Sequence, residues 1–304
     1  MTFRVVHRTE YHYDSVVSAS YGESHLHPRE TSFQQCYAAG LAIDPYPESY
    51  RERRDFYGNR AAHFCVREPH QRLVVTATSD VDVVDASRVV AAVGDRRWER
   101  VRDLTLSDPS SESRAARQFL LPSPAVTTLG AAAEYAAVSF PPGRALVEAM
   151  ADFAHRVYDD FEFAPGVTTV ATTIDEVMAR RAGVCQDFAH LCIAGLRSVG
   201  LATRYVSGYL ETEPPPGLPR LVGADQSHAW VSVYVPDVGW VDLDPTNDQF
   251  ANDRYVTVAW GRDYADVPPL KGVIFTQGVT QELSVRVDVV RTEGNAIADD
   301  ATAV

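Results

Sequence analysis

Three side chains suited to nucleophilic chemistry occur in the second half of the chain: Cys185, His228 and Asp244. Cys185 opens an apolar-periodic stretch that runs to Val199, and this spacing predicts a helix that begins near the cysteine. A thiol at a helix N-terminus lies near unpaired N–H groups and the positive end of the helix dipole, which favour the thiolate. An imidazole can take and return the thiol proton, and a carboxylate can fix the imidazole tautomer. These residue types predict a cysteine nucleophile, a histidine base and an orienting acid.

The surrounding sequence predicts the elements that must position these residues. A capping-box pattern at 173–176 predicts a short helix, and Gly200 ends the longer helix that carries Cys185. A further amphipathic helix is expected at 144–158, before the cysteine. The strands expected after the cysteine helix are rich in β-branched and aromatic residues and cover residues 201–210, 227–235 and 240–244.

A hairpin is expected to bring the histidine and the acid together. The turn at 236–239 joins two alternating strands, and a hairpin centred near Pro236 would place His228 and Asp244 roughly opposite each other. Asp242 lies on the same strand face as Asp244, so either carboxylate could be the third member of the triad on alternation alone.

Four segments together resemble the core of the bacterial transglutaminase-like proteins. They are the run at 182–187 around Cys185, the sequence RYVSGY at 204–209, the His228-Ala229-Trp230 strand and Asp244-Pro245-Thr246. The resemblance extends to that family's N-terminal β domain, through Pro28-Arg29 and residues 56–59, and to its C-terminal segment, through residues 261–272. Asp244, rather than Asp242, matches the family's Asp-Pro-Thr.

The resemblance implies an α+β fold with a papain-like core, in which a helix carrying the cysteine packs on an antiparallel sheet. It implies Cys185 as nucleophile, His228 as base and Asp244 as orienting acid. Gln186 departs from the family, where an arginine is common at this position. The departure leaves the triad intact and bears on substrate recognition.

Three aromatic residues are candidates for substrate binding: Trp230, Trp240 and Tyr209. For the tryptophans, plain hydrophobic packing is an equally good interpretation. The loop at 211–219 is rich in proline and could form a rim or lid beside His228, or a simple surface loop.

Other polar residues near the cysteine have simpler interpretations. Cys192 and His190 are expected to be core or helix-surface residues, and Asp187 is explained by the dipole of the first helical turn. No metal site is expected, because the four cysteines include no Cys-x-x-Cys pair and no His-Glu-x-x-His occurs. No nucleotide or other cofactor is expected either, since no glycine-rich phosphate loop follows a strand.

Composition narrows the class of partner. The chain has 304 residues, 45% of them hydrophobic and 23% charged, and a formal net charge of −13. This charge disfavours nucleic acid and anionic membrane as partners, and a peptide, a protein or a small amide is the expected substrate. The first residues lack the apolar stretch of a signal peptide, and four scattered cysteines fit reduced thiols, so a cytoplasmic location is expected.

Length and segment composition predict more than one domain. The expected organisation is a β-rich domain (1–88), a connector (89–143), the catalytic core (144–265) and a C-terminal extension with a late strand and a frayed tail (266–304). The predicted activity is cysteine-dependent hydrolysis of an amide or peptide bond through a thioester. Transfer of a glutamine acyl group to an amine, as in a transglutaminase, is the first alternative, and an inactive papain-like binding scaffold is the second.

Overall fold

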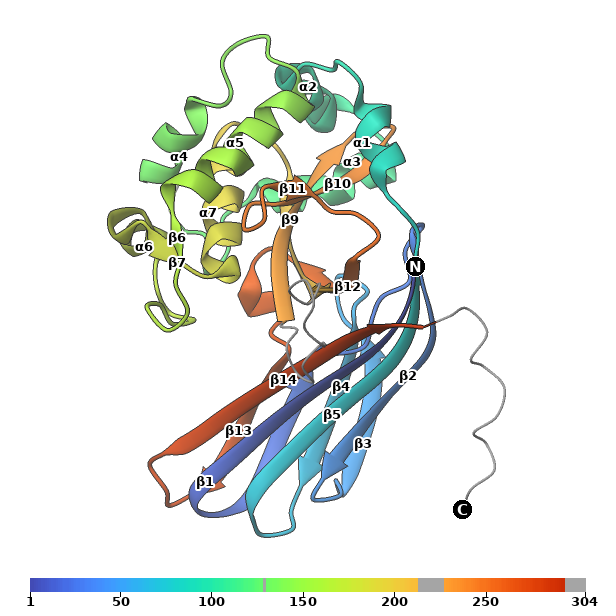
Figure 1. The fold of residues 1–304 in the computed structure, drawn as a ribbon, viewed down its shortest axis with the longest axis vertical. Helices are drawn as coiled ribbons and strands as arrows, with labels where there is room; N and C mark the ends of the chain where they lie inside the picture. The colour runs from blue at the N-terminus through green and yellow to red at the C-terminus, as the bar shows by residue number, and fades with distance from the viewer. Residues whose placement is uncertain (128–129, 213–226, 293–304) are drawn as a thin grey trace, which may run out of the picture.

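The computed structural model describes residues 1–127, 130–212 and 227–292. A β-sheet built from both ends of the chain forms one part, and a mixed helical and β part stacks on it (Figure 1). The predicted rim loop at 211–219 falls largely outside the described residues, as does the predicted tail at 295–304. Within the described ranges, no helix is long and apolar enough to cross a membrane. The cytoplasmic location stays a prediction of the sequence.

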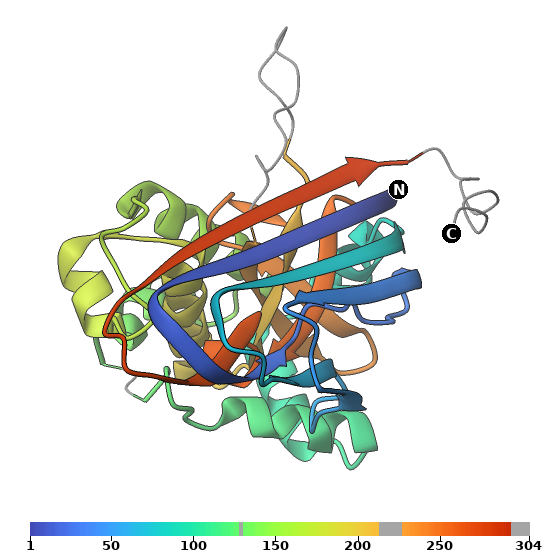
Figure 2. The same cartoon turned by 90° about the horizontal axis from the view of Figure 1, so that it is seen from below.

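The first sheet is organised around one long strand, β1 (Thr2–Ser24). The first half of β1 pairs antiparallel with β5 and β14, and its second half pairs with β4 and β13. Figure 2 shows β14 lying beside β1, so the C-terminal extension returns to the N-terminal domain and completes its sheet. The partner strands are β2 (Gln34–Asp44), β3 (Ser49–Arg54), β4 (Arg60–Val66), β5 (His70–Val83), β13 (Leu270–Thr276) and β14 (Gln281–Arg291).

The segment predicted as a connector is helical and contributes to the core. Gly195 of the cysteine helix shows this, because a Cβ there would lie 2.8 Å from Ala136 Cβ and 2.6 Å from Phe153 Cζ. Ala136 therefore packs directly on the cysteine helix. The elements of this segment are α1 (Ser87–Val93), α2 (Trp98–Ser107), α3 (Ser111–Ala116), the 3-10 turn η1 (Arg117–Leu120) and α4 (Gly130–Ala137).

The second part packs helices against a five-stranded antiparallel sheet of order β11-β10-β9-β8-β12. Its strands are β8 (Thr203–Leu210), β9 (Ser227–Val235), β10 (Gly239–Asp244), β11 (Gln249–Phe250) and β12 (Tyr255–Gly261), followed by η2 (Tyr264–Asp266). The preceding elements are α5 (Leu146–Asp160), α6 (Ile174–Arg180), α7 (Cys185–Ser198) and a parallel pair of short strands, β6 (Glu162–Phe163) and β7 (Ala182–Gly183).

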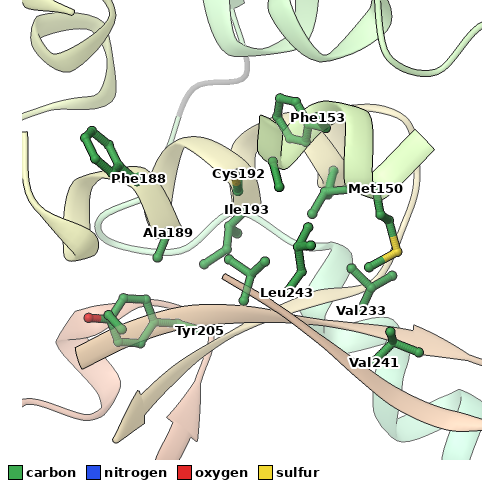
Figure 3. Close-up of a cluster of buried hydrophobic side chains, with 14 of the residues drawn as sticks. Met150, Phe153, Phe188, Ala189, Cys192, Ile193, Tyr205, Val233, Val241 and Leu243 are labelled. Atoms are coloured by element: carbon green, nitrogen blue, oxygen red, sulfur yellow. The ribbon is translucent and has the colours of Figure 1, made fainter. Parts of the chain in front are cut away.

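Helix α7 is buried on nearly every side, which fixes the position of its first residue. Figure 3 shows Ile193 and its neighbours facing Val233, Val241 and Leu243 of the sheet, with Phe153 of α5 beside the helix. Ile193, Val233 and Leu243 are fully buried, and burial of such a side chain contributes about 1.5–3 kcal/mol each. A helix anchored in this way holds Cys185 against the sheet with little freedom to move.

The β9–β10 hairpin differs in register from the sequence-based expectation. Leu243 pairs with Val231, so His228 and Asp244 are not directly opposite and the register differs by two residues from a hairpin centred on Pro236. The reason is the turn, which is centred on Asp237, a residue with φ of 65°. Because a shift of two residues keeps every side chain on its predicted face, the two residues still share one face of the hairpin.

Candidate active site

Cys185 is the first residue of α7, and the start of this helix is built around a buried carboxylate. Asp187 accepts the Val184 N–H at 2.8 Å and the Thr168 hydroxyl at 2.7 Å, which caps the helix one residue before the cysteine. Gly183 makes room for it, because a Cβ at this position would lie 2.8 Å from Asp187 Oδ2. The Cys185 N–H lies in the first turn, where no carbonyl of the helix can accept it.

His228 connects the thiol to the acid. Its Nε2 lies 2.7 Å from Asp244 Oδ2, and the two side chains are 10% and 0% exposed. Burial alone would lower the pKa of His228, but the charge of Asp244, its hydrogen bond and a hydrogen bond with Cys185 outweigh burial and raise the pKa to about 10. The imidazole therefore lies, with a raised pKa, between a thiol and a carboxylate, so that it can hold a proton taken from the thiol.

Asp244 is held in place by donors besides the histidine. Its Oδ2 accepts the Tyr255 hydroxyl at 2.7 Å and the Asn247 amide at 2.7 Å, and its Oδ1 accepts the Thr246 N–H at 2.9 Å. Burial favours the neutral acid, yet the charge of His228 and these hydrogen bonds lower the pKa of Asp244. The carboxylate therefore stays charged in a buried position and fixes the imidazole ring.

Sequence reasoning did not find Tyr255 or Asn247. Asn247 carries a weak signal, because it follows the Asp-Pro-Thr motif closely enough to fold back onto Asp244. Tyr255 carries none, since β12 reaches the site only by pairing with β8. The Tyr255 hydroxyl also accepts a hydrogen bond from Gln249 at 2.7 Å.

The hairpin register explains why Asp244, and not Asp242, meets the histidine. In this register each β9 side chain on the shared face reaches the carboxylate diagonally across from it. Trp230 donates from Nε1 to Asp242 Oδ2 at 3.1 Å. His228, two residues earlier on β9, makes the equivalent contact with Asp244, two residues later on β10. Asp242 thus serves the indole of Trp230.

Two of the three expected substrate-binding aromatics lie below the surface. Trp230 is 0% and Tyr209 is 2% exposed. Trp230 packs edge-on against Tyr255 beneath the site, and Gly208 leaves it space, because a Cβ there would lie 2.5 Å from the indole. The Tyr209 hydroxyl hydrogen-bonds to His7 Nδ1 at 3.1 Å, which ties the two parts of the molecule together.

Trp240, the third, lies at the other end of the hairpin. It is the second residue of β10, whereas Asp244 is the last, so the two are about 13 Å apart along the strand. Its ring packs edge-on against Phe119 and beside Tyr234. The structure therefore brings the three predicted triad residues together, buries Trp230 and Tyr209, and places Trp240 at the other end of the hairpin.

The remaining polar residues of α7 have structural positions. His190 Nε2 accepts the Tyr264 N–H at 3.2 Å, and burial lowers the pKa of His190 to about 4, which keeps this ring neutral. Cys192 is completely buried, and burial raises the pKa of its thiol. In the described part of the chain, no three His, Cys, Asp or Glu side chains gather closely enough to hold a metal ion.

Comparison with known proteins places this fold in a family. Residues 3–82 match the model of the bacterial transglutaminase-like N-terminal region, and residues 136–245 match that of the transglutaminase-like superfamily. The uncharacterized protein Rv2569c of Mycobacterium tuberculosis is 47% identical over 301 residues, covering 97% of this chain and 94% of that protein. The chain belongs to the bacterial transglutaminase-like family.

The chain is also similar to a solved structure over the whole fold and to a further protein over part of the sequence. A crystal structure from Cytophaga hutchinsonii, described as that of a candidate cysteine protease, superposes with a TM-score of 0.72 at 21% identity, covering 99% of this chain and 94% of that one. A protein-glutamine gamma-glutamyltransferase of Pseudomonas aeruginosa is 33% identical over 105 residues, which is 34% of this chain and 16% of that protein.

Proposed function

We propose that the protein is a cysteine hydrolase that cleaves an amide or peptide bond through a thioester on Cys185. The observation that carries the proposal is the continuous chain of contacts from the thiol through His228 to Asp244, with 2.7 Å between the imidazole and the carboxylate. Geometry and electrostatics agree here, because the buried carboxylate holds the imidazole both in place and charged.

The chemical steps follow from these positions. The sulfur of Cys185 bonds to the substrate carbonyl carbon, the C–N bond breaks, and His228 gives its proton to the departing amine. Water then attacks the thioester carbon and gives a proton to His228, the C–S bond breaks, and the acid leaves as the Cys185 thiolate and the His228 imidazolium are restored. The Cys185 N–H can donate to the carbonyl oxygen as negative charge develops on it.

The direct test replaces the sulfur. Cys185→Ala should abolish ammonia release from a blocked glutaminyl-glycine dipeptide while leaving the thermal unfolding midpoint nearly unchanged. Cys36→Ala is the matched control, because Cys36 is also partly exposed but lies on β2 in the other sheet. Ammonia release by Cys185→Ala at the wild-type rate would refute the proposal.

A substrate-independent measurement supports the same test. Iodoacetamide at pH 6 should modify Cys185 before Cys36, because the imidazolium of His228 stabilises the thiolate. Peptide mass mapping identifies the modified cysteine. His228→Ala should remove this selectivity, and a Cys185 that reacts no faster than Cys36 would instead favour an inactive scaffold.

Transfer of the acyl group to an amine is the second candidate function. The observation that favours it is the similarity of about a third of the chain to the Pseudomonas aeruginosa protein-glutamine gamma-glutamyltransferase. Hydrolysis is placed first because water is the default acceptor for a thioester in an accessible site. Incubation with the same dipeptide and a fluorescent primary amine separates the two, since faster amine incorporation than acid formation would reverse this order.

A further inference from the structure

A stack of arginine and tryptophan side chains joins the two parts of the molecule. The guanidinium carbon of Arg204 lies 3.6 Å from the ring centroid of Trp260 and 4.0 Å from that of Trp240. The Arg29 guanidinium carbon lies 3.5 Å from the Trp260 centroid. Two guanidiniums cannot occupy one face of a ring at this distance. The stacking order is therefore Arg29, Trp260, Arg204, Trp240.

The Arg204 side chain makes no hydrogen bond to any described residue, and its Nε is fully buried without a partner. It is 6% exposed, and both its faces are covered by indoles, so only its in-plane N–H groups remain to donate. Arg197 makes the contrast clear. It is 5% exposed and donates to the carbonyls of Leu121, Thr203 and Arg262. Leaving such donors unmatched is costly, and this points to an acceptor supplied from outside the chain.

Arg204 lines a cavity that has the dimensions of a small-ligand site. The cavity has a volume of about 300 Å³ and lies between β10, β12 and the segment that leads into β2. Its walls are largely apolar, with Phe33, Val83 and Val89 facing the two tryptophans. A volume at the lower end of the range for ligand pockets suits a molecule of a few heavy atoms rather than a peptide.

The cavity lining contains one cation and one acid. These are Arg204 and Asp242. Burial lowers the pKa of Arg204 to about 9 and the charge of Asp242 opposes this shift, but among the described residues no hydrogen bond joins the two side chains. Asp242 accepts from the Trp230 indole through Oδ2, and no described residue donates a hydrogen bond to its Oδ1. A cavity lined in this way suits a ligand with an acceptor for Arg204, a donor for Asp242 and an apolar body.

We propose that this cavity binds a small apolar α-amino acid, with its carboxylate on the edge of Arg204 and its ammonium group on Asp242. Planar guanidinium edges match carboxylates in a bidentate fashion, and the carboxylate of Asp242 matches an ammonium group. The apolar side chain lies against Phe33 and Val89. The site is separate from Cys185 and does not depend on the proposed hydrolysis.

The opposite side of the stack is a poorer place for such a ligand. Arg204, Trp240 and Trp260 also border a wider hollow of about 850 Å³. Its lining includes three acids and no cation besides Arg204, and these acids repel a carboxylate: Asp108, Glu112 and Asp237. The narrower cavity, with a single acid positioned for the ammonium group, is the better match.

Titration calorimetry with three related probes tests the proposal on the full chain. L-leucine carries both charges, N-acetyl-L-leucine lacks the ammonium group, and L-leucinamide lacks the carboxylate. Cys185→Ala protein is used so that no probe is turned over. We expect saturable binding of L-leucine and at least tenfold weaker binding of each of the other two. No saturable binding of L-leucine, or equal binding of all three, would overturn the proposal.

Two substitutions then assign the charged groups. Asp242→Asn keeps the acceptor for Trp230 and should weaken L-leucine at least tenfold while leaving N-acetyl-L-leucine unchanged. Arg204→Lys keeps the charge but loses the planar edge, and should weaken L-leucine and N-acetyl-L-leucine alike. Circular dichroism melting checks that each variant is folded. If either folded variant binds L-leucine as tightly as the parent, the proposed binding site is refuted. If a variant does not fold, the comparison of the three probes on the parent protein still tests the proposal.

Discussion

Charged side chains are buried in different ways near the two ends of the β9–β10 hairpin. At the open end, His228 and Asp244 are buried with hydrogen bonds from Tyr255 and Asn247. Towards the turn end, the side chain of Arg204 on the neighbouring strand β8 is buried between the indoles of Trp240 and Trp260, and it makes no hydrogen bond to any described residue. Hydrogen bonds fix direction to within a narrow angle, whereas stacking fixes a plane and leaves its edge free. This contrast is the physical basis of both proposals, proton transfer at the open end and ligand binding at Arg204.

The largest effect is expected at the open end. Asp244→Asn should lower kcat by about 10³–10⁴-fold with little change in KM, because an amide neither stabilises the imidazolium nor fixes the tautomer of the neutral imidazole. Asp242→Asn, an identical change two residues away, should cost less than tenfold, since Asp242 contacts Trp230 and not His228. Steady-state kinetics with the glutaminyl dipeptide measure both. A larger loss of kcat in Asp242→Asn than in Asp244→Asn would show that Asp242, and not Asp244, is the triad carboxylate.

The second prediction concerns pH. The pKa of His228 is raised from 6.5 to about 10, so its contribution to folding is complete below pH 6.5 and is lost as pH rises to 10. In the Cys185→Ala background, where no thiolate can offset the proton on the imidazole, the unfolding free energy relative to Cys185→Ala/His228→Gln should fall across this window, by at most about 1.4 kcal/mol per pH unit. Urea unfolding at pH 6, 8 and 10 measures the difference. A pH-independent difference between the two proteins would show that the imidazole is neutral in the folded state.

A smaller effect is expected for the hydrogen bond from Tyr255. Tyr255→Phe removes one donor to Asp244 and leaves Asn247 and Thr246 in place, so kcat should fall about tenfold, the lower end of the about 1.5–3 kcal/mol expected for a hydrogen bond to a charged group. The variant should otherwise fold normally, because the ring still packs on Trp230. Unchanged kcat would mean that the remaining donors suffice to hold the carboxylate.

Local pattern predicted much of the fold and part of the site. Helical periodicity placed Cys185 at a helix start, and strand alternation put His228 and Asp244 on one face, because both depend only on neighbouring residues. The predicted register was wrong by two residues, because a shift by an even number of residues leaves the alternating pattern unchanged. Only the conformation of the turn at Asp237 sets the register.

Contacts between distant segments could not be predicted in the same way. The pairing of β13 and β14 with β1 joins residues more than 240 positions apart, and alternation gives no partner for a strand. Tyr255 and the Arg204 stack could not be predicted for the same reason, since Arg29, Trp240 and Trp260 come from three separate segments. The stack does bring together residues from two segments on which the family resemblance was based, Pro28-Arg29 and residues 204–209.

The smallest effect is expected at the turn end of the hairpin, where stacking replaces hydrogen bonding. A double-mutant cycle of Trp240→Phe and Arg204→Met should give a coupling free energy of about 0.5–2 kcal/mol, because the indole is a better cation–π partner than a phenyl ring. Trp240→Phe keeps an aromatic ring against Phe119, so the cycle isolates the contact with the guanidinium. Urea unfolding supplies the four free energies, and kcat should stay within twofold for Trp240→Phe, since Trp240 lies far from Cys185. A coupling of zero would show that the guanidinium is held by the walls of the cavity alone, and the contrast between the two ends of the hairpin would then lose its physical basis.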